Sequence, residues 1–298
     1  MSPGPEMLLP RIGLVARTDT EEAVETALEL ALWLERKGHT VALDEATAVL
    51  AGFEGGRYSS EESYNLVVVL GGDGTLLGVA RNLAGRAPIL GVNLGRLGFL
   101  TELRRGELYT HLGRVLAGQF QVEERSLLAV ELVAPTGTVT SYRALNDAVI
   151  AKAAAGRVID LRLFVEGQLV ASYRGDGLIL STPTGSTAYN LSAGGPIVDP
   201  SLPVVMVTPI CPHTLSLRPM VLPDTRRLEV EVAGRHGEQV FLTLDGQQGA
   251  SLGLEDRVRV SRCAEPVKLV KASGRNFHDN LREKLHWGGL DDHQRARP

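Results

Sequence analysis

Apolar positions follow two different periods along the chain, and the change of period divides the chain in two. Over the first part, short buried strand patterns alternate with amphipathic helix patterns, which is typical of a parallel α/β domain. Strands are expected at 11–16, 40–43, 66–70 and 88–92, and helices at 18–37, 75–83 and 107–116, with a polar loop at 52–62. The strand at 66–70 is apolar throughout, as expected for a strand buried on both faces.

From Phe120 onward, strand patterns follow one another through glycine-bearing turns. They are expected at 121–133, 138–151, 158–165, 169–180, 204–208, 227–232, 240–244, 258–261 and 267–270. No long amphipathic helix separates them, so this region should be largely antiparallel. A helical pattern returns at 276–286, with Phe277, Leu281 and Leu285 on one face.

These patterns predict a fold that is α/β plus all-β. An N-terminal Rossmann-like parallel α/β domain, residues 1–118, is completed by residues 272–290, where the C-terminal helix packs back on it. A β-rich domain occupies residues 119–271. Residues 291–298 are expected to be disordered, because a polar terminus with no apolar face has nothing to bury.

Composition and charge restrict the partners. A net charge of -4 without a basic run argues against nucleic acid, and no apolar stretch reaches the roughly 18 residues of a membrane span. The N-terminal ten residues do not resemble a secretory signal. Cys211 and Cys263 are too few for a disulfide framework and lack metal-ligand spacing. We therefore expect a cytoplasmic protein.

The densest glycine signal is Gly71-Gly72-Asp73-Gly74-Thr75, which follows a buried strand and opens a helix. Ligands bind at such junctions in open α/β sheets, and glycines let a phosphate approach the main chain. The Lys-Ser/Thr ending of a P-loop is absent. An acid there repels phosphate unless it accepts a proton from an attacking hydroxyl or shares a metal ion. The alternative is a glycine-rich connection with a surface Asp.

Polar residues also interrupt apolar runs elsewhere. Asn146 and Asp147 either cap a local turn or face a ligand, because buried polar groups need partners. The segment 181–192 carries six Ser and Thr hydroxyls, and it is either a ligand-binding loop or an ordinary Ser/Thr-rich loop. Asn93 and Arg96 are candidates for phosphate or ribose contacts, with a structural turn as the alternative. The dipeptide Asp245-Gly246 is typical of a hairpin turn.

Taken together, these stretches resemble the NAD kinase family. The glycine motif alone is shared with lipid kinases and 6-phosphofructokinases, but Asn146-Asp147 and the run from Asp176 to Tyr189 follow it in the order and spacing of NAD kinases. The resemblance extends from about Arg11 to Trp287. It implies phosphoryl transfer from ATP, or from polyphosphate, to the 2′-hydroxyl of the adenosine ribose of NAD, which gives NADP.

The resemblance also implies a cofactor, an assembly and the roles of individual residues. The cofactor is a divalent metal cation such as Mg²⁺, bound mainly through the donor phosphates, and the assembly is a homodimer or homotetramer. Asp73 matches the proton acceptor, Gly74 its neighbour in the NAD site, and Asn146 with Asp147 the dinucleotide-binding pair. Further implied NAD contacts are Arg157, Arg174, Asp176, Thr187, Ala188, Tyr189, Asn190, Leu191, Ser192 and Gln247.

Two other functions compete with this interpretation. A lipid kinase of the same superfamily would need an apolar or basic membrane-facing surface, which the sequence does not display. A dinucleotide sensor without catalytic activity would bind NAD but would have no use for an acid beside phosphate. Asp73 is therefore the residue that separates an enzyme from a sensor.

Overall fold

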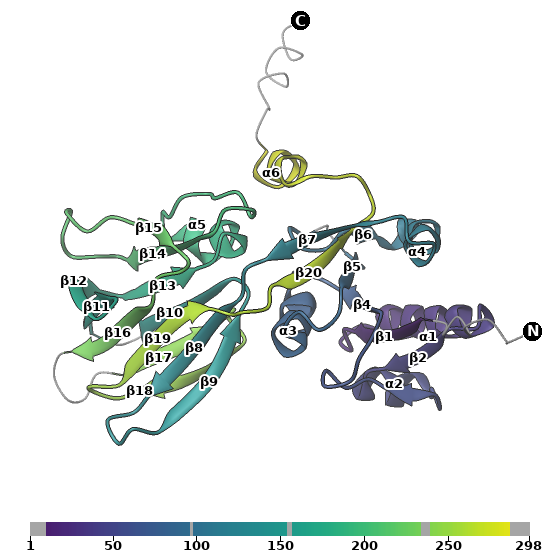
Figure 1. Cartoon of the computed structure of the whole chain (residues 1–298), viewed down its shortest axis with the longest axis horizontal. Helices are drawn as coiled ribbons and strands as arrows, with labels where there is room; N and C mark the ends of the chain where they lie inside the picture. Colours follow the sequence, from purple (N-terminus) through teal and green to yellow (C-terminus); the bar gives the residue numbers. More distant parts are fainter. Residues whose placement is uncertain (1–9, 96–97, 154–156, 234–238, 287–298) are drawn as a thin grey trace, which may run out of the picture. The chain divides into compact units, whose positions relative to one another are not determined.

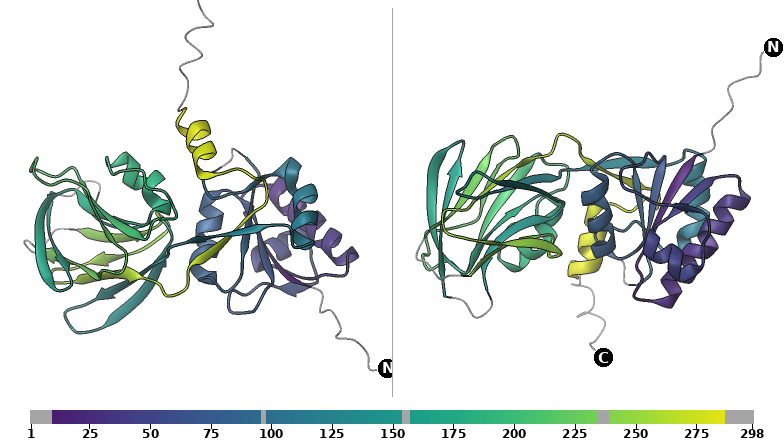
Figure 2. Two further views of the ribbon diagram at one scale, coloured as in Figure 1. Left: turned by 45° about the horizontal axis from the view of Figure 1, so that its top comes forward. Right: turned by 90° about the horizontal axis from the view of Figure 1, so that it is seen from below.

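The chain forms two compact units in the computed structural model, which describes residues 10–95, 98–153, 157–233 and 239–286. The first unit contains the described parts of 1–79, 86–123 and 268–298, and the second contains those of 80–85 and 124–267. Figure 1 shows the elements of both units. The N-terminal and C-terminal parts of the sequence therefore share the first unit, as Figure 2 shows for the yellow C-terminal segment.

An eight-stranded sheet forms the centre of the first unit among the described residues. Its order is β3-β2-β1-β4-β5-β20-β7, with β6 beside β5. Its strands are β1 (Arg11–Ala16), β2 (Thr40–Leu43), β3 (Gly56–Arg57), β4 (Leu66–Gly71), β5 (Ile89–Asn93), β6 (Leu103–Arg104), β7 (Gln121–Arg125) and β20 (Val267–Lys271). β4 is buried along its whole length and pairs in parallel with β1 and β5. This is the arrangement that its uniformly apolar sequence predicts.

The helices of the first unit follow the amphipathic patterns. They are α1 (Glu21–Arg36), α2 (Glu45–Ala51), the start of α3 (Asp73–Leu83), α4 (Leu108–Leu116) and α6 (Phe277–Leu285). α1 buries Ala27, Leu30 and Leu34, which recur at helical spacing. The predicted return of the C-terminal helix is confirmed: α6 buries Leu281 and belongs to the first unit.

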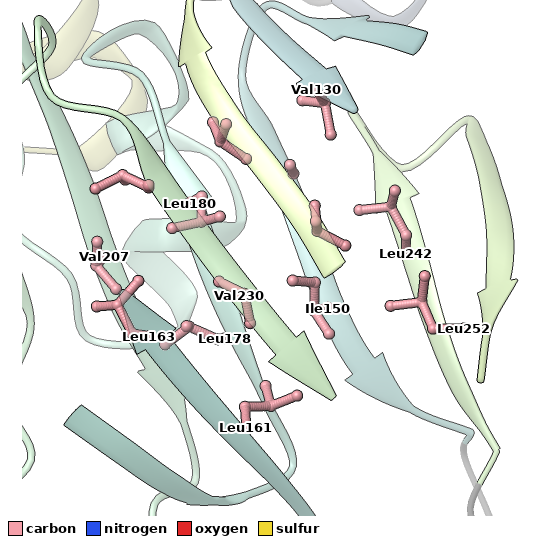
Figure 3. Packing of buried hydrophobic residues seen from close by; sticks show 14 of the residues in the cluster. Val130, Ile150, Leu161, Leu163, Leu178, Leu180, Val207, Val230, Leu242 and Leu252 are labelled. Carbon is pink, nitrogen blue, oxygen red and sulfur yellow. The ribbon is translucent and has the colours of Figure 1, made fainter. Parts of the chain in front are cut away.

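The second unit contains two antiparallel six-stranded sheets among the described residues, with orders β15-β14-β13-β10-β17-β18 and β12-β11-β16-β19-β8-β9. The strands are β8 (Leu128–Val133), β9 (Val139–Ala144), β10 (Asp147–Lys152), β11 (Ile159–Val165), β12 (Gln168–Gly175), β13 (Gly177–Ser181), β14 (Val204–Ile210), β15 (Met220–Pro223), β16 (Leu228–Ala233), β17 (Val240–Leu244), β18 (Gln248–Leu252) and β19 (Arg257–Arg262). Side chains of both sheets, among them Ile150, Leu178 and Val230, make up one core (Figure 3). The predicted antiparallel domain is confirmed.

Several short elements were not predicted. α2 has seven residues, too few for a helical period to show, although Asp44 caps it and Gly52 ends it at φ +63°. The loop expected at 52–62 contains β3, and the edge strand β18 is too exposed for its pattern to be recognised. The segment 181–192 is not a simple loop, because it contains the 3₁₀ helix η2 (Thr184–Thr187) and the short helix α5 (Tyr189–Ser192). The expected disorder at 291–298 lies outside the described residues.

Candidate active site

Asp73 is the first residue of α3 and follows β4 after one intervening glycine. Its Oδ2 accepts a hydrogen bond from the backbone N–H of Phe99 at 2.7 Å. Its Oδ1 accepts from the N–H groups of Leu100 at 3.1 Å and Thr101 at 3.2 Å. Three consecutive N–H groups of the loop after β5 therefore fix the carboxylate. Because a carboxylate oxygen has two lone pairs, Oδ2 can still accept a hydrogen bond from a substrate hydroxyl.

The loop 98–101 approaches Asp73 so closely that only glycine fits at its start. A Cβ on Gly98 would lie 1.8 Å from Asp73 Oδ1. Thr101 Oγ1 accepts from the N–H of Gly98 at 3.0 Å and from Asn93 Nδ2 at 3.1 Å, and Asn93 Oδ1 accepts from the N–H of Gly95 at 2.6 Å. The buried Asn93 side chain thus stabilises the turn, which was the structural alternative. Arg96, the other candidate in this stretch, lies outside the described residues.

The two glycines before Asp73 have different surroundings. A Cβ on Gly71 would lie 2.5 Å from Thr75 Oγ1, so close packing requires glycine there. A Cβ on Gly72 would meet no atom within 4 Å, so packing does not explain this glycine. Gly72 faces a pocket of about 360 Å³ that Arg17, Thr18, Asp19, Gly72, Gly74 and Thr75 line. The pocket brings hydroxyls and the N-terminus of α3, which suit phosphate, together with the ion pair of Arg17 and Asp19.

In the second unit, the turn Asn146-Asp147 lies between β9 and β10 and is organised by Asp245. Asp245 Oδ1 accepts from the N–H groups of Asn146 at 2.7 Å and Asp147 at 3.1 Å, and Oδ2 accepts from that of Leu145 at 3.0 Å. Asp245 has φ +51° and Gly246 has φ +67°, so the predicted hairpin turn is also present. Asp245, a residue of the 245–246 turn, is therefore the acceptor that shapes the turn at Asn146 and Asp147.

Arg81 completes this group of residues. Its Nη1 lies 2.7 Å from Asp245 Oδ2, and its Nη2 lies 2.7 Å from Gln247 Oε1. The side chains of Arg81 and Asp245 are 5% and 0% exposed, so each charge depends on the other for its stabilisation. The predicted residues Asn146, Asp147 and Gln247 are thus brought together by Arg81, which the sequence did not indicate, and by Asp245, which the sequence indicated only as a turn residue. Asp245 is marked only by the Asp-Gly dipeptide, and Arg81 carries no sequence signal.

Asp147 has an unusual protonation equilibrium. Burial of its side chain, and then the charge of Asp245, raise its pKa to about 7. Both effects disfavour the carboxylate form. Near neutral pH, a large fraction of Asp147 therefore carries a proton and can donate a hydrogen bond.

The hydroxyl-rich segment is mostly used within the fold, which corrects the ligand-binding interpretation for its first half. Ser181, Thr182, Thr184 and Ser186 are buried. Ser181 Oγ donates to the carbonyl of Asn146 at 3.1 Å, and Thr182 Oγ1 donates to that of Leu145 at 2.6 Å. These hydroxyls hold the Asn146-Asp147 turn from the side opposite to its N–H groups, so they support the turn rather than offer donors to a ligand.

Asn190 is also buried and has an internal role. Its Nδ2 donates to the carbonyl of Pro196 at 3.0 Å, and its Oδ1 accepts from Thr208 Oγ1 at 2.6 Å. A Cβ on Gly195 would lie 2.1 Å from Asn190 Oδ1, so the glycine leaves room for the amide. The Asn190 side chain therefore helps to hold α5 in place. In the same segment, Tyr189 and Ser192 are exposed, and Thr187, Ala188 and Leu191 are half-buried.

The three other residues predicted to contact NAD are Asp176, Arg174 and Arg157. Asp176 pairs with Lys152 at 3.3 Å. Arg174 is two-thirds exposed on the edge strand β12 and lies 3.9 Å from Asp160, so it belongs to the other sheet. Arg157 is exposed, and the residues immediately before it lie outside the described chain.

Two protein-family models match most of the chain. The model of the ATP-NAD kinase N-terminal domain matches residues 12–120, and that of the ATP-NAD kinase C-terminal domain matches residues 145–272. The chain belongs to the NAD kinase family. The match covers both the Asp73 junction and the Asn146-Asp147 turn, so the resemblance read from the sequence is confirmed.

Individual NAD kinases agree with the family assignment. The NAD kinase of Geobacter sulfurreducens is 46% identical over 286 residues, which cover 94% of this chain and 99% of the relative. That of Solibacter usitatus is 43% identical over 284 residues, with the same coverage. The chain is therefore an enzyme, a NAD kinase. Neither the lipid-kinase nor the sensor alternative finds support in these matches.

Solved structures of NAD and NADH kinases share the fold. Yeast NADH kinase complexed with NADH has a TM-score of 0.85 at 25% identity, covering 94% of this chain and 89% of the yeast chain. A NAD kinase from Archaeoglobus fulgidus in complex with ATP has a TM-score of 0.73 at 27% identity, covering 93% and 98%. The predicted combination of a parallel and an antiparallel domain is that of NAD kinases.

The described residues also limit how a NAD kinase of this sequence can hold a metal ion. They contain no group of three or more His, Cys, Asp or Glu side chains that could hold one. Mg²⁺ normally keeps several waters and needs only one or two carboxylates besides the phosphates of its substrate. The described residues therefore fit a metal ion that arrives with the substrate phosphates. No helix in the described ranges is long and apolar enough to cross a membrane.

Proposed function

We propose that this enzyme transfers the γ-phosphoryl group of ATP to the 2′-hydroxyl of the adenosine ribose of NAD, with Asp73 as the proton acceptor. The observation that carries the proposal is the placement of the Asp73 carboxylate. It stands at the N-terminus of α3, between Gly72 and Gly74, which line a pocket of about 360 Å³, and three N–H groups of residues 99–101 hold it in one orientation. A base positioned in this way supplies about 10²- to 10⁴-fold in rate.

The 2′-oxygen forms a bond to the γ-phosphorus as the bond from that phosphorus to the bridging oxygen of ADP breaks, and the hydroxyl proton passes to Asp73 Oδ2. Phosphoryl transfer requires little more from the protein than alignment and compensation of charge. A bound divalent cation such as Mg²⁺ would neutralise charge on the donor phosphates. Arg17 and the first N–H groups of α3 would add to that neutralisation from the protein side.

The pocket above Gly72 is the proposed donor site. It offers main-chain groups and the Thr18 and Thr75 hydroxyls, which suit phosphate oxygens, and the Arg17 guanidinium, which also pairs with Asp19. The crystal structure of the Archaeoglobus fulgidus relative in complex with ATP supports ATP as the donor. Polyphosphate, which presents the same oxygens, is the second candidate donor.

The Asn146-Asp147 turn is proposed to bind NAD. Its N–H groups and two of its carbonyls are already paired within the fold, which leaves the two side chains for a ligand. Further contacts are proposed for Arg157, Arg174, Asp176, Gln247 and the segment from Thr187 to Ser192, in which Asn190 offers only its main chain. The yeast relative complexed with NADH supports a nicotinamide dinucleotide as the ligand.

The decisive experiment compares two substitutions in an assay of NADP formation from NAD, ATP and magnesium. Asp73→Asn should lower kcat by about 10²- to 10⁴-fold while calorimetry still detects NAD binding. Asn146→Ala should instead weaken NAD binding. A loss of kcat below tenfold in Asp73→Asn would remove this residue from the proton transfer, and unchanged NAD affinity in Asn146→Ala would leave that side chain a structural role.

We also propose that the enzyme acts in the cytoplasm as a homodimer or homotetramer. Both cysteines are free, which suits a reducing compartment. The edge strand β12 exposes Leu169 and Val170, and an apolar edge of this kind is normally protected by pairing or by association. Light scattering coupled to size exclusion measures the assembly directly, and a monomer would contradict the proposal.

A further inference from the structure

Glu102 is a buried carboxylate that ties the active-site loop to the C-terminal segment of the first unit. Its Oε1 accepts from the N–H of Ala272 at 2.9 Å, the N–H of Ser273 at 2.7 Å and Ser273 Oγ at 2.6 Å. Its Oε2 forms an ion pair with Lys271. Four donors from three consecutive residues therefore surround one side chain that is only 2% exposed.

The same residue ends the loop that holds Asp73. Thr101, its neighbour, donates its N–H to Asp73 Oδ1, and the N–H of Glu102 itself donates to the carbonyl of Gly91 at 2.9 Å. A Cβ on Gly91 would lie 3.1 Å from the Cα of Thr101, so the loop is packed closely against β5. The end of the loop is thus held from two directions, by β5 and by residues 271–273.

We propose that Glu102 is a positioning residue for Asp73, and that residues 271–273 thereby support the phosphoryl-transfer site. This inference rests on the proposed role of Asp73 as the proton acceptor. The Glu102 side chain does not touch the Asp73 carboxylate. It fixes the backbone of residues 99–101, whose N–H groups determine where the carboxylate lies. A shift of about 1 Å in a reacting group costs on the order of 10²-fold in rate, so such support affects turnover.

Glu107 provides a matched control. It is also in the first unit, its Oε1 pairs with Arg275 at 2.7 Å and its Oε2 accepts from the N–H of Arg104 at 2.8 Å. It therefore also connects a carboxylate to the C-terminal segment. The hydrogen bonds of the Glu107 carboxylate do not include the loop 98–101. Substitution of Glu107 therefore weakens attachment of the C-terminal segment without directly affecting that loop.

The first experiment compares Glu102→Gln with Glu107→Gln. Glutamine keeps the shape of glutamate but places an NH₂ group where the carboxylate accepted hydrogen bonds, so one side of the cluster repels its donors. We expect Glu102→Gln to lower kcat by at least about tenfold with KM for NAD changed less than about twofold. Glu107→Gln should leave kcat unchanged. A wild-type kcat in folded Glu102→Gln overturns the proposal, as does an equal loss in Glu107→Gln.

The second experiment separates this inference from the role of Asp73 by combining Glu102→Gln with Asp73→Asn. If Glu102 acts through Asp73, it should change the residual kcat of Asp73→Asn less than about twofold, because residues that act as a unit are not additive. The same fold-loss in both backgrounds overturns the positioning role. Should Asp73→Asn alone keep its kcat, the base assignment fails, which is a distinct result.

A milder variant guards against a folding defect in Glu102→Gln. Ser273→Ala removes one hydroxyl donor to Glu102 and leaves the carboxylate and the Lys271 pair in place. We expect a folded protein whose kcat is lowered about two- to fivefold with KM for NAD unchanged, in line with the loss of one charge-assisted hydrogen bond. Circular dichroism and thermal unfolding establish folding for each variant. If Glu102→Gln does not fold, an unchanged kcat in Ser273→Ala overturns the proposal.

Discussion

The guanidinium of Arg81 lies 2.7 Å from the carboxylate of Asp245, and both side chains are almost completely buried in the second unit. Asp245 also accepts three backbone N–H groups from residues 145–147. The buried pair thus connects the last turn of α3 to the turn that carries Asn146 and Asp147. Its charges are compensated only while all of these contacts are present.

Removal of Arg81 should therefore be costly. Arg81→Met leaves the Asp245 carboxylate buried without its cation, and we expect a loss of about 3 kcal/mol in the free energy of unfolding, measured in urea. NAD affinity, measured by calorimetry, should fall in the same variant, because Asp245 also shapes the Asn146-Asp147 turn. The matched control is Arg162→Met, since Arg162 pairs with Glu231 at 3.1 Å but is 53% exposed. Arg162→Met should lower the free energy of unfolding by less than about 1 kcal/mol. Equal costs at the two positions would contradict the account.

Asp147 should make the stability of the protein depend on pH. Its folded pKa of about 7 lies above the unfolded value of about 3.9, so the native state binds more protons than the unfolded state between these pH values. Stability therefore falls as the pH rises from about 4 to about 7. Asp147→Asn removes this contribution and should gain stability relative to wild type, on the order of 4 kcal/mol at pH 8, because each unit between the two pKa values corresponds to about 1.4 kcal/mol.

Urea unfolding at several pH values between 5 and 8 checks this prediction for Asp147. The difference between Asp147→Asn and wild type should increase with pH and level off above about pH 7. Asp160→Asn is the control, because its side chain is 43% exposed and lies beside Arg174. Parallel curves for wild type and Asp147→Asn would show that the carboxyl group is not protonated in the folded state.

Features formed by contiguous residues could be predicted from the sequence, whereas contacts between residues far apart in the chain could not. The strand β4 and the junction at Asp73 were predicted correctly, because a run of buried β-branched residues and a glycine motif are contiguous in the chain. Arg81 and Asp245 are 164 positions apart, and Glu102 and Lys271 are 169 apart. Nothing in either local sequence indicates such a partner, so only the folded chain reveals these two buried clusters.

The hydroxyl-rich segment shows a second limit of sequence reasoning. A hydroxyl is a donor and an acceptor whether it faces a ligand or a main-chain carbonyl. Ser181 and Thr182 face the carbonyls of Asn146 and Leu145, whereas Ser192, on α5, is exposed. The number of hydroxyls in the segment is therefore equally consistent with ligand binding and with support of the main chain. Burial, which depends on the packing of β10 against β13, distinguishes them.

Gly98 should be essential for turnover rather than for folding as such. A Cβ at this position would lie 1.8 Å from Asp73 Oδ1, so Gly98→Ala must displace either the loop or the carboxylate. We expect kcat to fall by at least about tenfold. Gly106→Ala is the control, because a Cβ there meets no atom within 4 Å. Wild-type turnover in Gly98→Ala, measured by NADP formation, would mean that the position of the carboxylate is not critical.

Gly72 tests the donor pocket, because packing places no demand on it. A Cβ on Gly72 meets no atom within 4 Å and its φ lies outside the left-handed region, so Gly72→Ala should fold with stability within about 0.5 kcal/mol of wild type. The added methyl group would nevertheless project into the pocket that Thr75 and Arg17 line, where a phosphate must approach the main chain. We expect KM for ATP to rise by about tenfold or more while calorimetric affinity for NAD is retained, a split that a general folding defect would not produce. Unchanged KM for ATP in Gly72→Ala would place the donor phosphates elsewhere, and a parallel loss of NAD affinity would show that the glycine serves both substrates.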